Sequence, residues 1–235
     1  MSTTRITLCV FYFGAIFADL LSGVDMRVLI MFSAALLLVG CQSAYYGAAE
    51  SFGYHKRDIL VDRVEESRDA QQEAEEQFQS ALEQLFELTD FDGGDLEHMY
   101  EAMAEEYEDS VAAADTVSER IDAVDHVAKS LFREWETEID EYSSARLKAD
   151  SQAKLRDTSK RYDGMITVLR RSEEKMEPVL SALKDNVMYL KHNLNARAIA
   201  SLKVEFGEIE DDIAALIVEM RKAIASSDAF IESMQ

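Results

Sequence analysis

The side chains that usually carry catalysis are scattered along this sequence rather than grouped. Its four histidines, His55, His98, His126 and His192, form neither a His-x-x-x-His nor a Glu-x-x-His pair. Di-iron helical bundles need the Glu-x-x-His spacing on two helices, so that chemistry is excluded. Phosphate-binding loops, dinucleotide fingerprints and Gly-x-Ser-x-Gly elbows do not occur in the sequence either. We therefore predict no catalytic residue, no cofactor, no metal site and no enzymatic activity.

An acidic turn has a spacing similar to that of a calcium loop. Asp90, Asp92 and Glu101 fall at positions 1, 3 and 12 of an EF-hand-type count. Position 6, which requires glycine for the sharp turn, holds Asp95, and position 5 holds Gly94, which has no side-chain oxygen. The segment is therefore predicted to be a solvated hairpin tip without a bound cation.

Cys41 is the residue with the clearest chemistry. It follows Arg27 and an apolar run, 28–40, whose thirteen residues are too few to span a bilayer and match a signal-peptide core. The ending at 38–41 resembles the lipobox of bacterial lipoproteins, in which the cysteine sulfur is diacylated, for instance with palmitate, and the chain is cut before the cysteine. An uncleaved signal anchor with an incidental cysteine is the alternative. We predict lipidation at Cys41.

The region before Cys41 is predicted to direct export. Residues 1–40 contain a second apolar run at 6–18, so either Met26 is the true start or a long segment precedes the same cleavage site. Gln42, rather than aspartate, follows the cysteine, which in the lipoprotein class favours the outer membrane, facing the periplasm. Residues 41–57 are interpreted as a lipidated tether. Its aromatic residues suit either the membrane surface or the near end of the folded domain: Tyr45, Tyr46, Phe52 and Tyr54.

Composition favours an all-α domain over residues 58–235. The 235-residue chain has one proline and nine glycines, fewer turn residues than a β-rich fold would need. Its two cysteines, Cys9 and Cys41, both precede this domain, which therefore has no disulfide framework. The net charge of −22 argues against binding nucleic acid.

The domain has apolar residues spaced alternately four and three apart, which indicates left-handed helix packing. The first two predicted seams are Leu60, Val64, Ser67, Gln71, Ala74, Phe78, Ala81, Leu85 and Leu88, and then Met103, Tyr107, Ser110, Ala114, Val117, Ile121, Val124, Ala128, Leu131, Trp135, Glu138 and Tyr142. The other two are Leu155, Ser159, Tyr162, Ile166, Leu169, Glu173, Met176, Leu180, Leu183, Val187, Leu190 and Leu194, and then Ile199, Leu202, Phe206, Ile209, Ile213, Leu216, Met220, Ala223, Ser227 and Phe230. Core packing is therefore also expected for the aromatic cluster Phe132, Trp135 and Tyr142.

Breaks between these seams predict an elongated, antiparallel, coiled-coil-like bundle of four long helices. The expected spans are about 44–89, 95–142, 146–192 and 195–233. Ser143 and Ser144 are candidate helix caps, and Pro178 is expected to bend its helix without ending it. The alternative merges the second and third spans, which leaves three helices. Residues 58–141 have 28 acidic and 5 basic residues and 142–204 have 13 basic and 7 acidic, so charge attraction between these segments is expected to favour one helix register.

Several short motifs of the mature chain carry a family resemblance. They are Ser43-Ala44-Tyr45-Tyr46 after the lipobox, Glu134-Trp135-Glu136, Pro178-Val179-Leu180 and Leu190-Lys191-His192-Asn193-Leu194-Asn195-Ala196. With them the chain resembles the domain-of-unknown-function 2959 family of bacterial lipoprotein-like proteins. The resemblance implies a predominantly helical exported protein and assigns no functional residues.

We expect a non-enzymatic periplasmic lipoprotein that acts as an envelope scaffold or adaptor. It would bind a membrane through the lipid on Cys41, and a protein partner or a second copy through its helices, with no small-molecule substrate. The alternatives are a homo-oligomeric coiled-coil assembly and, less favoured by the apolar seams, a ligand-binding or enzymatic bundle.

Overall fold

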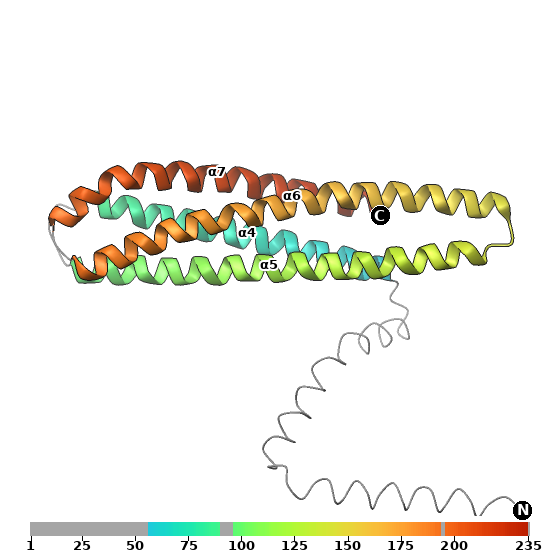
Figure 1. Cartoon of the computed structure of the whole chain (residues 1–235), viewed down its shortest axis with the longest axis horizontal. Coiled ribbons are helices and arrows are strands. Elements are labelled where there is room, and N and C mark those ends of the chain that lie inside the picture. Colours follow the sequence, from blue (N-terminus) through green and yellow to red (C-terminus); the bar gives the residue numbers. More distant parts are fainter. Residues whose placement is uncertain (1–55, 90–95, 194–195, 235) are drawn as a thin grey trace, which may run out of the picture. The chain divides into compact units, whose positions relative to one another are not determined.

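Four helices account for the described part of the chain, residues 56–89, 96–193 and 196–234 of a computed structural model (Figure 1). They are α4 Lys56–Thr89, α5 Leu96–Glu141, α6 Ala145–His192 and α7 Ala196–Met234. The predicted four-helix bundle is confirmed. The expected helical residues 44–55, the export region and most of the tether lie outside the described residues.

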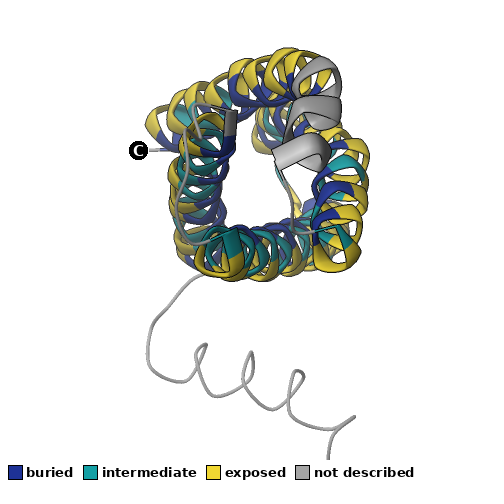
Figure 2. Cartoon of the chain, turned by 90° about the vertical axis from the view of Figure 1, so that its left-hand side faces the viewer, coloured by how far each residue is buried: buried dark blue, intermediate teal, exposed yellow. Residues whose placement is uncertain are grey.

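The helices run antiparallel in chain order around a shared core. α4 packs against α5 and α7, and α6 packs against the same two helices, so α4 and α6 lie diagonally opposite (Figure 1). Seen along the bundle, the buried residues face the space enclosed by the four helices (Figure 2). Since the packing is antiparallel, the start of α4, the end of α7 and the α5–α6 turn share one end of the bundle.

The α5–α6 turn excludes the three-helix alternative. α5 ends at Glu141, and Ser144 caps α6 with extended backbone angles, φ −87° and ψ 113°. The Ser144 hydroxyl accepts a hydrogen bond from the backbone N–H of Leu147 at 3.4 Å. This bond satisfies one of the free amides of the first helical turn, as expected of a serine cap. α6 continues through Pro178, so the prediction that this proline does not end the helix is confirmed.

The predicted seams are correct for α4 and for the described part of α7. All nine predicted positions of α4, from Leu60 to Leu88, are buried, and so are the eight predicted positions from Phe206 to Phe230 of α7. The apolar side chains among them supply the hydrophobic stabilisation of the fold.

From Tyr162 to Leu190 the predicted seam of α6 is wrong at every second position, and Leu155 and Ser159 before it are only half-buried. Its observed core positions are Tyr162, Met165, Leu169, Ser172, Met176, Val179, Leu183, Asn186 and Leu190. The structure therefore buries Ser172 instead of Glu173, and Asn186 instead of Val187. The side chains of consecutive helical residues point about 100° apart. Where either of two consecutive residues could face the core, contacts with the other helices decide which one does. Glu173 instead accepts a hydrogen bond from Ser118 of α5 at 2.5 Å.

The predicted seam of α5 fails near the end of that helix. Glu138 and Tyr142 are exposed, and Trp135 is only half-buried. α4 begins at Lys56, whose Nζ lies 2.7 Å from Oε2 of Glu134. α5 continues for seven residues beyond Glu134, a rise of about 10 Å, and has no α4 residue beside it in the described chain. Within the described residues, α5 and α6 therefore extend as a two-helix hairpin beyond Lys56 of α4 and Met234 of α7 (Figure 1).

A polar layer crosses the middle of the core. The Ser172 hydroxyl of α6 donates to Oε1 of Gln71 on the diagonal helix α4 at 2.9 Å, and both side chains are fully buried. Ser67 and Ser227 are also fully buried. Within the described residues, Nε2 of Gln71 and both of these serine hydroxyls have no hydrogen-bond partner. A buried polar group of this kind lowers stability, so this layer is a weak point of the apolar core.

Candidate functional site

The histidines and acidic residues weighed in the sequence analysis are not gathered into a reactive site in the described chain. His98, His126 and His192 are exposed, and His55 is outside the described residues. Over residues 56–89, 96–193 and 196–234, no group of three or more His, Cys, Asp or Glu side chains could hold a metal ion. Cys41 and the acidic turn with Asp90 and Asp92 lie outside those ranges, so lipidation and the absence of calcium stay predictions.

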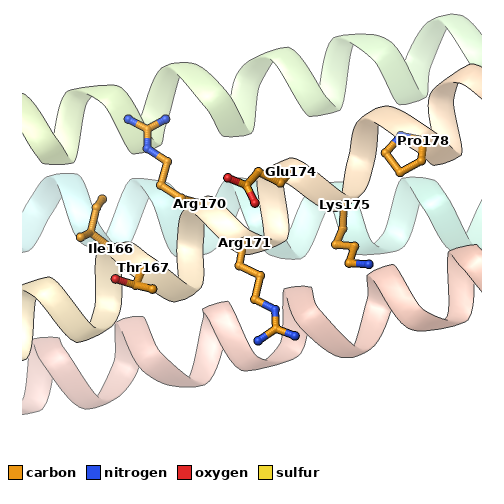
Figure 3. A pocket seen from close by; sticks show the side chains of 7 residues that line it. All are labelled: Ile166, Thr167, Arg170, Arg171, Glu174, Lys175 and Pro178. Atoms are coloured by element: carbon orange, nitrogen blue, oxygen red, sulfur yellow. The ribbon is translucent and has the colours of Figure 1, made fainter.

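One hollow of about 740 Å³ lies along the outer face of α6 (Figure 3). It is lined by Ile166, Thr167, Arg170, Arg171, Glu174, Lys175 and Pro178. All seven lining residues come from a single helix. Arg170 points toward α5, whereas Arg171 and Lys175 point toward α7 (Figure 3). The lining cations therefore diverge, whereas a small-molecule site needs polar groups that converge.

Two of these arginines are engaged in holding helices together. Arg170 pairs with Asp122 of α5 and with Glu173 of its own helix, the second at 2.9 Å. Arg171 pairs with Glu219 of α7 at 3.4 Å. A hydrogen bond from Lys222 and the nearby charge of Arg171 lower the pKa of Glu219 against the opposing effect of burial. These contacts make the hollow a structural surface of α6.

Ion pairs also join the other neighbouring helices. Arg68 and Arg221 link α4 to α7 through Asp228 at 3.3 Å and Glu75 at 2.8 Å. Arg120 of α5 lies 3.0 Å from Glu66 of α4. Exposed pairs of this kind are individually worth less than about 1 kcal/mol. None of these three pairs joins the acidic segment 58–141 to the basic segment 142–204, so they do not test the expected charge attraction between those segments.

An aromatic group ties three helices together at the base of the hairpin. The Tyr162 ring of α6 stacks edge-on with Phe132 of α5 at 5.4 Å and with Phe230 of α7 at 6.4 Å. Its hydroxyl donates to Asp125 at 2.7 Å. Burial and this hydrogen bond raise the pKa of Tyr162. Although burial acts to raise the pKa of Asp125, hydrogen bonds from Lys129 and Tyr162 leave it below its ordinary value.

The predicted aromatic cluster of α5 is therefore divided. Phe132 joins the group around Tyr162, and the indole N–H of Trp135 donates to the Ser151 hydroxyl at 2.8 Å across the hairpin. Tyr142 is 45% exposed, so the prediction that it packs in the core is wrong. Helical periodicity indicates which face of α5 is apolar, but not where the covering helices stop.

Exposed apolar side chains gather at the two ends of the bundle. Tyr142 and Leu147 flank the α5–α6 turn. Phe86 lies near the end of α4, and Met188 and Tyr189 lie near the end of α6, at the opposite end of the bundle. Sequence reasoning did not identify either set as a surface, because these residues were assigned to seams or passed over.

No described helix combines the length and apolar character needed to cross a bilayer.

Comparison with protein families gives a match over most of the chain. The profile of the family described as "Protein of unknown function (DUF2959)" matches residues 45–234. No curated protein and no solved structure matches the chain. The match spans nearly all of the sequence after Cys41, including every described helix, and it confirms the resemblance seen in the short motifs. The chain belongs to the DUF2959 family.

Proposed function

We propose that this chain is a non-enzymatic lipoprotein of the bacterial envelope that serves as a scaffold or adaptor. A lipid on Cys41 would hold it at the outer membrane, facing the periplasm. One observation supports this proposal above the others. Both ends of the bundle's chain meet at one end of the fold, where the Arg57 guanidinium of α4 donates to the backbone carbonyl of Met234 at the end of α7.

The meeting of the two ends gives a lipid anchor a geometric consequence. The tether enters the bundle at Lys56, so the lipid holds the end that also contains Met234 and the α5–α6 turn. α5 and α6, with 46 and 48 residues, are each about 70 Å long. The opposite end, where α4 and α6 finish, can then reach a partner several tens of ångströms from the anchor.

The bundle is suited to act as a spacer because its interior is continuous. Buried side chains follow α4 from Ile59 to Leu88 and α5 from Met103 to Ala128. Ion pairs link each helix to both of its neighbours around the ring. A packed core resists bending, since interiors are close-packed and poorly compressible. A partner bound at one end is therefore held at a defined distance from the other.

The far end has the side chains best suited to a protein partner. Met188 is 51% exposed beside Tyr189, and methionine and tyrosine are enriched in protein interfaces. Val218 on α7 is 49% exposed but lies midway along the bundle, which makes it a matched control position. A photo-reactive amino acid placed at Met188 or at Val218 of the full chain, in intact cells, tests for a partner at the far end.

The adaptor proposal predicts a discrete protein adduct from position 188 and no such adduct from position 218. Adducts between two copies from position 218 would instead favour the homo-oligomeric assembly. If neither position yields an adduct while the protein remains in the envelope, the adaptor role is wrong. A compact small-angle scattering profile of the purified mature protein would separately exclude the spacer.

A further inference from the structure

The α5–α6 hairpin extends past the other two helices at the end where the tether enters. Lys56, the first described residue of α4, lies beside Glu134, and α5 continues to Glu141. α7 ends at Met234, four residues after Phe230, whose ring meets Tyr162 of α6. α6 begins at Ala145, many residues before Tyr162, so this part of α6 extends past the end of α7. Among the described residues, the hairpin turn therefore projects farthest in this direction.

The tip of this hairpin combines apolar and basic side chains. Tyr142 is 45% exposed and Leu147 is 42% exposed, on either side of the turn. Arg146 and Lys148 alternate with Leu147 on the first turn of α6. Lys148 pairs with Asp140 at 2.9 Å, whereas Arg146 has no ion partner in the described chain. Tyrosine with long basic side chains is typical of the interface between bilayer and water, where the ring and the charged ends each find their preferred surroundings.

A second copy of the chain meets a charge conflict at this tip when like helices face each other. One two-fold arrangement of two hairpin tips would place α5 against α5 of the other copy. The exposed acidic residues at the end of α5, Glu136, Glu138 and Glu141, would then face their own counterparts. Juxtaposed like charges disfavour association, so the charge pattern opposes this arrangement.

We infer that the hairpin tip, Tyr142 to Lys148, contacts the lipid bilayer that holds the Cys41 anchor. The inference rests on the proposed lipid anchor. About 15 residues separate Cys41 from Lys56, which limits this end of the bundle to roughly 50 Å from the anchored cysteine. The projecting tip can reach the bilayer from there. A tether of this length keeps the tip at a high local concentration beside the bilayer, which strengthens even a weak contact.

The neighbouring acidic residues determine the kind of lipid surface that fits. Glu138 and Glu141 are exposed next to the tip and would be repelled by a strongly anionic surface. Contact through Tyr142 and Leu147 should therefore occur on zwitterionic phosphatidylcholine vesicles and depend little on salt. Attachment through basic residues alone would show the opposite dependence on lipid charge and salt.

Trp135 is the only tryptophan of the chain, so a single reporter can be moved. In full chains carrying the lipid, Trp135→Phe is combined with either Tyr142→Trp at the tip or Tyr189→Trp at the far end. Tyr142 and Tyr189 are 45% and 40% exposed, which makes them a matched pair. Each protein is placed in phosphatidylcholine vesicles containing brominated lipids, and quenching of tryptophan fluorescence is measured. Circular dichroism first verifies that each variant is helical.

Quenching at the tip should exceed quenching at the far end by at least about two-fold, because tryptophan prefers the bilayer interface. Adding Leu147→Asp to the tip variant should reduce its quenching to the far-end value. Equal quenching at both positions, in a protein that stays with the vesicles after a salt wash, overturns the tip contact and leaves the anchor standing. A blue-shifted tip signal in native envelopes but not in pure vesicles also overturns it, since a protein would then cover the tip. A chain that leaves the vesicles on washing refutes both proposals.

Discussion

The buried hydrogen bond between Ser172 and Gln71 can be tested by removing its two side chains singly and together. It joins diagonal helices at 2.9 Å in a part of the core that water does not reach. Ser172→Ala removes the donor to Oε1 of Gln71, and Nε2 already has no partner in the described chain. A newly unsatisfied buried group costs about 1–3 kcal/mol, so the free energy of unfolding should fall by that amount.

The double variant Ser172→Ala with Gln71→Leu should reverse this loss. It removes the whole polar pair, including Nε2, and replaces the amide with an apolar group of comparable size. Replacing both partners of a buried polar contact is close to neutral or stabilising. We expect the double variant to be at least as stable as the parent and about 1–3 kcal/mol more stable than Ser172→Ala.

Urea unfolding followed by far-ultraviolet circular dichroism measures all four proteins of this cycle. Thr137→Ala is the matched control, because the exposed Thr137 hydroxyl bonds only to the backbone carbonyl of Arg133 on its own helix. Its effect should stay within about 0.5 kcal/mol. A double variant less stable than Ser172→Ala would refute the reasoning, because the polar layer would then be a source of stability.

Three further predictions concern local features of the helices. An added Cβ at Gly164 or Gly207 meets nothing within 4 Å, so Gly164→Ala and Gly207→Ala should each stabilise the bundle by about 0.5–1 kcal/mol, measured as a higher urea midpoint; a lower midpoint would contradict this. Ser144→Ala removes the cap of α6 and should cost about 0.5–2 kcal/mol in the same assay, whereas the neighbouring Ser143→Ala, which removes no cap, should change little. The raised pKa of Tyr162 means that its stabilisation is complete below its ordinary pKa of 10.0 and is lost as the pH rises above that value. The stability advantage of the parent over Tyr162→Phe should therefore shrink above pH 10, and a constant difference would show that Tyr162 ionises freely in the folded protein.

The sequence was sufficient for the helix count, for most helix boundaries and for the core positions of α4 and of the described part of α7. Four-three spacing and the serines at 143 and 144 predicted α5 and α6 to within a few residues, since periodicity and caps are local properties. The sequence pattern placed Glu173 rather than Ser172 in the core of α6, and this was wrong. Which of the two side chains faces inward depends on the hydrogen bond from Ser172 to Gln71 of α4, 101 residues away in the chain. The exposure of Tyr142 could not be predicted for a similar reason. It depends on where α4 and α7 end beside α5, which the pattern of α5 does not contain.

The candidate interaction surfaces also divide into features that a local sequence pattern reveals and features that depend on how the helices pack. Cys41 is recognisable from a local pattern, and its lipidation stays a prediction because it lies outside the described residues. The hairpin tip was not recognisable in advance, since the exposure of Tyr142 and Leu147 depends on which described helices lie beside them. The far end with Met188 and Tyr189 emerges only when four helix termini are placed in space.

The central claim is that a lipid on Cys41 holds one end of this bundle, and the mass of the N-terminal peptide tests it most directly. The measurement is mass spectrometry of the full protein purified from envelopes in detergent. We predict a chain that begins at Cys41 and has the added mass of a diacylglycerol thioether and an N-linked acyl chain. A mature chain that retains any of residues 26–40, or one that begins elsewhere with an unmodified cysteine, would contradict the anchor, and with it the proposed orientation of the bundle.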